Sequence, residues 1–356
     1  MTTVGIKAAA YCLNFAPELA LHYGGTPAQE RRSKPDSEFL RELPKHAQTW
    51  EQAAAYAPNK TYVGGMSLDE LEKAPAPWID NLGDPQRYGK FGEIMPEDEF
   101  IGLMDICDVF DLIWLEQGFA AAVAEKLARN PVMGEKQLAR LEKGRPAAEL
   151  LEVIEKQHAL PLYFENTLVA CCRRAHDTDE NLEAGVMLEN LASKASGVLA
   201  LLHLIKNAGM APADVDFVVE CSEEAVGDAM QRGGGNMAKA LAEIAECVNA
   251  SGFDVRGFCA GPVAALITSA GMVASGVRPN VVARIPGASP RRLWILGHMD
   301  VVPPGELSYW KTDPWKVVVD GDKIRGRGVE DNQQAIVCGL LIAQELKAQE
   351  IGRAHV

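Results

Sequence analysis

The chain has 356 residues, 47% hydrophobic and 24% charged, which is the composition of a globular protein with room for two or three domains. Its net charge of −14 argues against nucleic acid or an anionic membrane surface as a partner, and no apolar run approaches the roughly 20 residues that span a bilayer. Eight cysteines without a CxxC pair, and an N-terminus without a secretory signal, indicate a reduced, cytoplasmic protein.

The first 160 residues are rich in turns and helices. Glycine and proline punctuate residues 1–90, and the Ser-initiated segments 37–43 and 67–73 read as short helices between the turns. A strongly apolar helix is expected to begin at residue 95 and to continue to residue 128, because a proline and three acidic residues favour a helix start. A second helix is predicted over 146–156.

The pattern changes after residue 160. Segments 160–164 and 167–171 flank Glu165 and Asn166 and predict a hairpin. A long helix over 181–207, stopped by Gly209, precedes further elements that alternate between strand and helix. These are a strand at 215–221, a helix at 237–247, a strand at 255–258 and a helix over the apolar run that follows Pro262. This order predicts a layered α/β fold.

The junction between the last strand and helix places Cys259 in a tight Gly-Phe-Cys-Ala-Gly corner. Unpaired N–H groups and the positive end of the helix dipole favour an anion there, so a thiolate is stabilised and becomes a stronger nucleophile at neutral pH. Pro262 suits the first helical turn, where its missing N–H costs nothing. The alternative is a buried structural cysteine, since free cysteine is among the most buried residue types.

Several stretches carry a family resemblance: 23–32, 91–100, 171–176, 199–221, 231–236 and 254–262. Residues 199–221 and the Cys259 corner look like the first half of a thiolase or ketoacyl-synthase fold. The whole segment 1–277 resembles the beta subunits of component C of the glycine/sarcosine/betaine reductase complex.

This resemblance implies an acyltransferase of amino-acid-fermenting anaerobes that needs no cofactor. Its partners would be the component C alpha subunit and selenoprotein A, and phosphate would be the acceptor that yields acetyl phosphate. By position, Cys259 would carry the acetyl thioester. One departure stands out, because the His and the Asn or second His that the second half of a thiolase-type fold supplies have no counterpart here.

The carboxy-terminal piece has a different character. Stretches 280–287, 293–304 and 315–332 are similar to aminoacylase/carboxypeptidase-type dinuclear zinc peptidases. That resemblance implies His298 as a zinc ligand, Asp300 as the residue that orients its imidazole, and Asp331 as the bridge between two metals. The alternative for His298 is a core histidine at a strand end. The remaining ligands of such a site would lie beyond residue 350, so the zinc site is expected to be incomplete.

We therefore expect a loop- and helix-rich region at 1–160, half of a thiolase-like α-β-α fold at 161–277 and a truncated α/β metallopeptidase fragment at 279–350. The last residues, 351–356, match one reading frame of a widely used sequencing adapter and are expected to be an artefactual tail of a chimeric reading frame. Three functions follow: acyl transfer through Cys259, zinc-dependent amide hydrolysis by a fragment, or docking without catalysis. Two incomplete folds are also expected to expose apolar faces.

Overall fold

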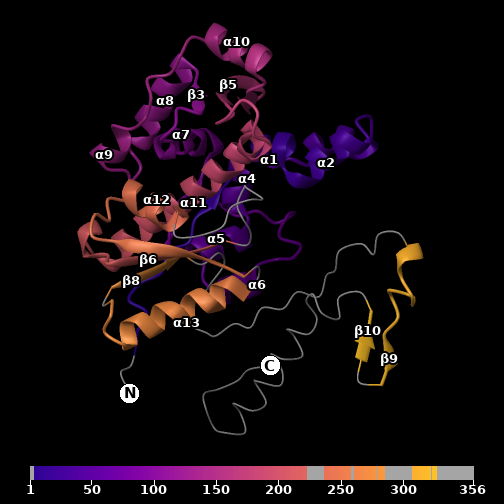
Figure 1. Cartoon of the computed structure of the whole chain (residues 1–356), viewed down its shortest axis with the longest axis vertical. Coiled ribbons are helices and arrows are strands. Elements are labelled where there is room, and N and C mark those ends of the chain that lie inside the picture. The colour runs from indigo at the N-terminus through magenta and orange to yellow at the C-terminus, as the bar shows by residue number, and fades with distance from the viewer. Residues whose placement is uncertain are drawn as a thin grey trace. The chain divides into compact units, whose positions relative to one another are not determined.

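The computed structural model describes residues 4–222, 236–257, 260–278, 280–284, 307–321 and 323–326. The chain divides into two compact units, Met1–Gly287 and Ala288–Val356, and each is described by itself. Figure 1 shows the described helices and strands along the chain.

The first unit begins with short helices joined by tight turns. The side chains of Thr49 and Ser67 cap α4 and α6, and the backbone N–H of each cap residue donates in return to the side chain of the third helical residue. Strand β1 pairs in parallel with β2. These elements are β1 (Leu13–Asn14), α1 (Pro17–Tyr23), α2 (Gly25–Ser33), α3 (Glu38–Glu42), η1 (Leu43–His46), α4 (Trp50–Ala55), α5 (Ala57–Val63), α6 (Leu68–Lys73) and β2 (Ile94–Met95).

The single helix expected over 95–128 is wrong, because a strand interrupts it. Helix α7 (Glu97–Cys107) ends where the Asp108 carboxylate accepts the N–H of Phe110 at 2.9 Å and of Ile113 at 2.8 Å. These bonds turn the chain into β3, which is the edge of an antiparallel sheet of order β3-β5-β4. The elements that follow α7 are β3 (Ile113–Leu115), α8 (Gln117–Leu127), α9 (Glu135–Leu138), α10 (Ala147–Gln157), β4 (Leu160–Phe164), β5 (Thr167–Cys172) and η2 (Glu180–Leu182).

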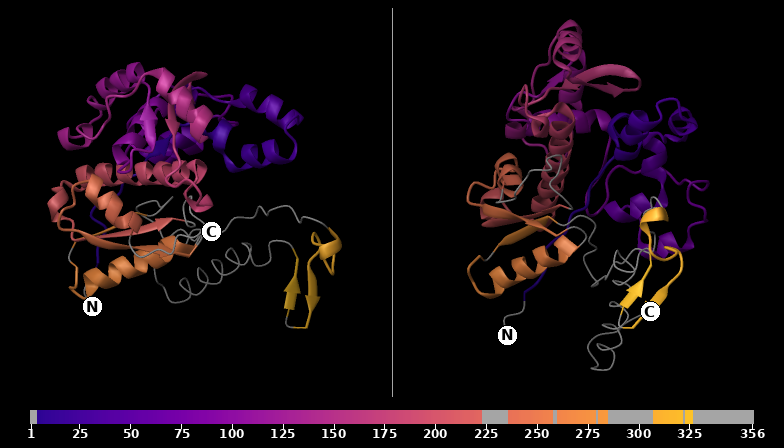
Figure 2. Two further views of the ribbon diagram at one scale, coloured as in Figure 1. Left: turned by 45° about the horizontal axis from the view of Figure 1, so that its top comes forward. Right: turned by 45° about the vertical axis from the view of Figure 1, so that its right-hand side comes forward.

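The predicted α/β alternation is confirmed between α11 and β8. Strand β6 lies at the centre of a parallel sheet of order β7-β6-β8, in register with both neighbours. Helices α11 and α12 cover one face of this sheet and α13 covers the other (Figures 1 and 2). The elements are α11 (Ala184–Ala208), η3 (Pro212–Asp214), β6 (Phe217–Ser222), α12 (Asn236–Ile244), β7 (Ser251–Arg256), α13 (Gly261–Ala274) and β8 (Val281–Arg284).

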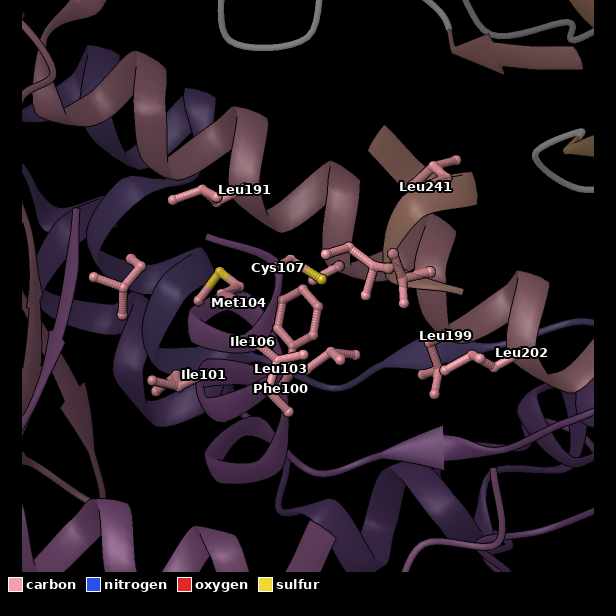
Figure 3. Packing of buried hydrophobic residues seen from close by; sticks show 14 of the residues in the cluster. Phe100, Ile101, Leu103, Met104, Ile106, Cys107, Leu191, Leu199, Leu202 and Leu241 are labelled. Carbon is pink, nitrogen blue, oxygen red and sulfur yellow. The ribbon is translucent and has the colours of Figure 1, made fainter. Parts of the chain in front are cut away.

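The side chains of β6 alternate between these two layers. Val218 belongs to the large core that α7, α11 and α12 build, whereas Val219 and Cys221 pack with Ala265 of α13. Helix α7 is buried along its whole length. Figure 3 shows its apolar side chains beside those of α11 and Leu241 of α12. The sheet is therefore anchored to a core that reaches back to the first hundred residues.

The outer face of α13 is apolar and exposed. No charged residue occurs between Gly261 and Ala274. Val263 is 56% and Ile267 69% exposed. The apolar side of this helix that faces away from the sheet is thus in contact with water.

The first compact unit extends past residue 279 and includes a strand of the parallel sheet. Strand β8 (Val281–Arg284) pairs in parallel with β6, and the first unit extends to Gly287. Backbone pairing with β6 therefore keeps residues 281–284 in the sheet. In the second unit the structure describes η5 (Leu307–Tyr309) and an antiparallel pair of strands, β9 (Val318–Asp320) and β10 (Lys323–Arg325). None of the helices described in either unit is long and apolar enough to cross a membrane.

Candidate functional site

The corner around Cys259 is formed by the end of β7 and the start of α13. β7 ends at Arg256 and α13 begins at Gly261, with Ala260 as its N-cap. The N–H groups of Ala260 and Gly261 donate to the carbonyl of Gly257 at 3.0 and 3.1 Å. The expected sequence of strand, tight turn and helix is therefore present. Cys259 itself lies outside the described residues.

Two small residues let α13 start close to the sheet. A Cβ atom on Gly261 would lie 2.6 Å from Sγ of the buried Cys221 on β6. A Cβ atom on Gly257 would meet the backbone of Gly261 at 3.3 Å. Since real Cβ atoms essentially never come within 3.0 Å of such neighbours, a side chain at position 261 would force Cys221 or the start of α13 to shift. Pro262 occupies the first turn at no hydrogen-bonding cost, and the helix N-terminus is thereby fixed over the end of β6.

A buried polar cluster lies on the opposite face of the same strand ends. Glu220 of β6 and Asp254 of β7 are register partners, and both side chains are fully buried. The Arg256 guanidinium donates to Glu220 at 2.6 Å and lies 3.5 Å from Asp254. The Asp254 carboxylate also accepts the N–H groups of Met237 and Ala238 at 3.1 and 2.8 Å. Asp254 thus ties β7 to the first turn of α12.

This polar cluster was not predicted from the sequence, although a signal was present there. Glu220 stands in the apolar run 217–222, where a charged residue is rarely fully buried without a partner. Asp254 and Arg256 alternate on β7 and therefore face the same side as one another. A buried acid in one parallel strand and an alternating acid and base in another predict an ion pair at the sheet's carboxyl end.

The carboxyl edge of a parallel sheet is where α/β folds place ligands. Here that edge has the N-terminus of the 14-residue helix α13 on one side and the Arg256 guanidinium, with 23% of its side chain exposed, on the other. The helix N-terminus favours an anion, whereas the Arg256 guanidinium is already bonded to the carboxylates of Glu220 and Asp254. The arrangement can therefore hold a thiolate, an oxyanion or a carboxylate in the turn between β7 and α13.

The predicted metal site cannot be assembled from the described residues. His298, Asp300 and Asp331 all lie outside them. Within the described ranges, no group of three or more His, Cys, Asp or Glu side chains could hold a metal ion. Residues 231–236, one of the stretches that carry the family resemblance, also lie outside the described part except for Asn236, the first residue of α12.

The adjacent cysteines of β5 are structural. Cys171 and Cys172 are both buried and belong to different core clusters, as expected for strand neighbours on opposite faces. Burial raises the pKa of the Cys171 thiol to about 12 and also raises the pKa of Cys172. Both thiols are thus protonated at neutral pH and unsuited to redox exchange.

Comparison with known proteins gives two distinct matches along the chain. A model of peptidase family M20/M25/M40 matches residues 294–355. An uncharacterized metallohydrolase of Methanocaldococcus jannaschii is 45% identical over 65 residues, 18% of this chain and 16% of that protein. A succinyl-diaminopimelate desuccinylase of a Methylobacterium species is 48% identical over 59 residues, 17% of this chain and 15% of that protein.

The larger match covers most of the chain. The glycine/sarcosine/betaine reductase complex component C subunit beta of Peptoclostridium acidaminophilum is 48% identical over 290 residues, 80% of this chain. The chain spans 56% of the length of that relative. Among solved structures, a priming β-ketosynthase of the R1128 polyketide pathway is 30% identical with a TM-score of 0.21 and covers 24% of each chain. At 48% identity over four-fifths of its length, the chain is similar to the component C beta-subunit family of this reductase complex.

Proposed function

We propose that the first unit acts as the acyl-carrying part of component C of the glycine/sarcosine/betaine reductase complex, with Cys259 as the nucleophile. The observation that carries the proposal is the glycine-walled turn between β7 and the N-terminus of α13, in a chain similar to this family. A corner of this kind suits a cysteine that must both accept and release an acyl group. The proposal also includes the prediction that residues 161–277 form half of a thiolase-like α-β-α fold.

The chemistry requires a thiolate that is also a good leaving group. The thiolate of Cys259 would hold an acetyl group as a thioester, and an oxygen of inorganic phosphate would attack its carbonyl carbon. The C–S bond then breaks, the C–O bond of acetyl phosphate remains, and the electron pair returns to sulfur as thiolate. The dipole of α13 stabilises negative charge on sulfur both before acylation and after release.

The chain's own charged cluster supports this environment. The Arg256 guanidinium is oriented by Glu220 and Asp254 and lies three residues before Cys259. Held in this way, its guanidinium keeps a fixed position at the end of β7, with part of its side chain exposed. We assign Arg256 to positioning an anionic group, either the thiolate or the attacking phosphate, in that turn. The two carbons of the acetyl group would come from selenoprotein A, and the component C alpha subunit would be a partner.

Alkylation distinguishes this proposal from a buried structural cysteine. The purified chain is treated with limiting iodoacetamide at pH 7, and labelled cysteines are identified by peptide mass spectrometry. Burial raises the pKa values of Cys12 and Cys107 to about 12 and that of Cys247 to about 11, so these thiols should react slowly. Cys259 should be labelled first, and a Cys259→Ser variant should lose that label.

The control for labelling is Cys338, which the family match places in the second unit and which lies outside the described residues. A Cys338→Ser variant should retain the rapid label on Cys259. Equal labelling of Cys259 and the buried cysteines, or labelling confined to Cys338, would refute the nucleophile assignment. Transfer of radiolabelled acetyl from acetyl phosphate to Cys259, the reverse of the release step, would provide a second readout.

The peptidase-family match to residues 294–355 favours a second candidate function for the second unit, as a fragment of a metal-dependent amide hydrolase. His298 and Asp331 would be the metal ligands and Asp300 the orienting carboxylate, with zinc as the implied metal. The described residues do not assemble that site, so no reaction step through zinc is derived. Zinc bound at one equivalent per chain and abolished by His298→Ala, measured by atomic absorption, would support it. Zinc content unchanged in that variant would exclude it.

A further inference from the structure

A cavity of about 450 Å³ lies beside the turn that joins α5 to α6. Its lining includes Lys60 of α5, Gly65 of the turn and Lys73 of α6. Gly64 ends α5 in the left-handed conformation, with φ of 83°. The N–H groups of Gly65 and Met66 donate to the carbonyl of Lys60 at 2.6 and 3.1 Å. Backbone hydrogen bonds therefore hold this wall of the cavity in place before any ligand binds.

Lys60 is a buried cation without an anionic partner. The residue is 7% exposed. Among the described residues, the one acceptor of its ammonium group is the backbone carbonyl of Asp84 at 3.2 Å, and no carboxylate forms an ion pair with it. A lysine is rarely buried to this extent without a charged partner, because the ammonium group loses its hydration. The ammonium group can donate more than one hydrogen bond, so the single carbonyl leaves donors for a ligand.

Basic side chains outnumber acidic ones around this cavity. Of the described residues that line it, Lys60 and Lys73 are basic and Glu70 is the one acid. Oε2 of Glu70 already accepts the backbone N–H and the hydroxyl of Ser67 at 2.7 and 2.8 Å. Hydrogen bonds from Ser67 lower the pKa of this carboxyl, and the positive charges of Lys60 and Lys73 lower it further. An adjoining hollow of about 290 Å³ shares Glu70 and adds Lys90, so one carboxylate faces three ammonium groups.

We propose that the cavity beside the α5–α6 turn binds a small organic anion, whose carboxylate or phosphate group contacts the ammonium of Lys60. Lys73, which is exposed, supplies a second cation. Met66 and Ala74 give the cavity an apolar part, and the Gln86 amide can bond a hydroxyl or carbonyl group of the ligand. Apolar lining with a few polar groups that fix orientation is typical of small-molecule sites of this size. The inference goes beyond the proposed function, because the site uses no residue of the turn between β7 and α13.

The test measures ligand binding to the full chain by saturation-transfer NMR titration. The probes are butyrate, monobutyl phosphate and butanol, which carry a carboxylate, a phosphate and no charge on the same alkyl chain. We expect at least one of the two anions to bind saturably at concentrations up to about 10 mM, which would saturate a site with a dissociation constant of about 1 mM. Butanol should not bind in that range. The anion with the lower dissociation constant identifies the group that the site prefers.

The test variants are Lys60→Met and Lys73→Met, which remove the ammonium group and keep a long side chain. The matched control is Lys156→Met, because Lys156 is 66% exposed, pairs with Glu152 and does not line the cavity. Circular dichroism establishes that each variant is folded. Lys60→Met should weaken binding about tenfold or more, because a hydrogen bond to a buried charge is lost. Lys73→Met should weaken it by about threefold and Lys156→Met by less than about twofold, since exposed charges contribute less.

Added sodium chloride should weaken binding of the anions by the unmodified chain. The inference would be overturned if neither anion bound saturably, or if butanol bound as tightly as the anions. Unchanged affinity in both cavity variants would also overturn it, and Lys73→Met alone decides if Lys60→Met does not fold. An equal loss in Lys156→Met would contradict it too, because the attraction would then come from surface lysines in general.

Discussion

Replacing Gly261 by alanine tests whether the close start of α13 is a structural requirement. The added Cβ would lie 2.6 Å from Sγ of Cys221, more than about 1 Å inside the separation at which such atoms attract one another. Overpacking of this size in a closed core costs about 1–3 kcal/mol. We therefore expect Gly261→Ala to lower the free energy of unfolding by that amount.

The same helix supplies a control of opposite sign. Gly271 lies in α13, and a methyl group added there would have no neighbouring atom within 4 Å, so Gly271→Ala should gain about 0.5–1 kcal/mol from helix propensity. Urea unfolding followed by circular dichroism measures both variants. In a Cys221→Ala background, where Sγ is absent, the cost of Gly261→Ala should fall below about 1 kcal/mol. The close-approach argument would be refuted if both substitutions changed the free energy of unfolding in the same direction. It would also be refuted if the cost of Gly261→Ala were the same with and without Cys221→Ala.

Two further predictions concern buried charge. The Arg87 guanidinium donates to the fully buried Glu93 at 2.9 Å and to Glu99 at 2.7 Å. Arg87→Ala should therefore lower the free energy of unfolding, measured with urea, by about 3–5 kcal/mol. Arg129→Ala breaks an exposed ion pair and should lower it by less than about 1 kcal/mol. Burial raises the pKa of Asp105 from 3.8 to about 7, so the folded state holds this proton more tightly than the unfolded chain does. Its contribution to stability is therefore fully present below pH 3.8 and is lost as pH rises through about 7. The free energy of unfolding should therefore fall less steeply between pH 4 and pH 7 in Asp105→Asn than in the unmodified chain. An unchanged slope in this variant would contradict the prediction.

The elements that the sequence predicted best are those with strong local signals. The hairpin of β4 and β5 turns at Glu165 and Asn166, and both residues have positive φ, as a tight hairpin turn requires. Gly209 ends α11 in the left-handed conformation expected of a helix stop. The mixed α/β class was predicted because segments with strand patterns alternate with segments with helix patterns after residue 181.

What the sequence missed depended on contacts between distant residues. Strand β3 is a three-residue apolar segment that reads as a continuing helix until Asp108 is seen to bond the backbone of Ile113. The ion pair of Glu220 with Arg256 joins two strands, so the charged residues in each strand suggest a partner but the pairing itself depends on the register of the sheet. Residues 280–282 read Asn-Val-Val and suit a strand in either fragment, so only pairing with β6 assigned them to the first sheet. Cys259, His298, Asp300 and Asp331 remain sequence predictions.

The central place of β6 has a consequence for the order in which the protein forms during synthesis. Both of its neighbours, β7 and β8, are made after it, whereas α7 and α11 are made before it. A nascent chain can therefore shield one side of β6 early, but one hydrogen-bonding edge stays open until β7 is made and the other until residue 284 has left the ribosome. During that interval β6 is the segment most exposed to capture by another strand, and slower elongation before residue 284 should increase misassembly.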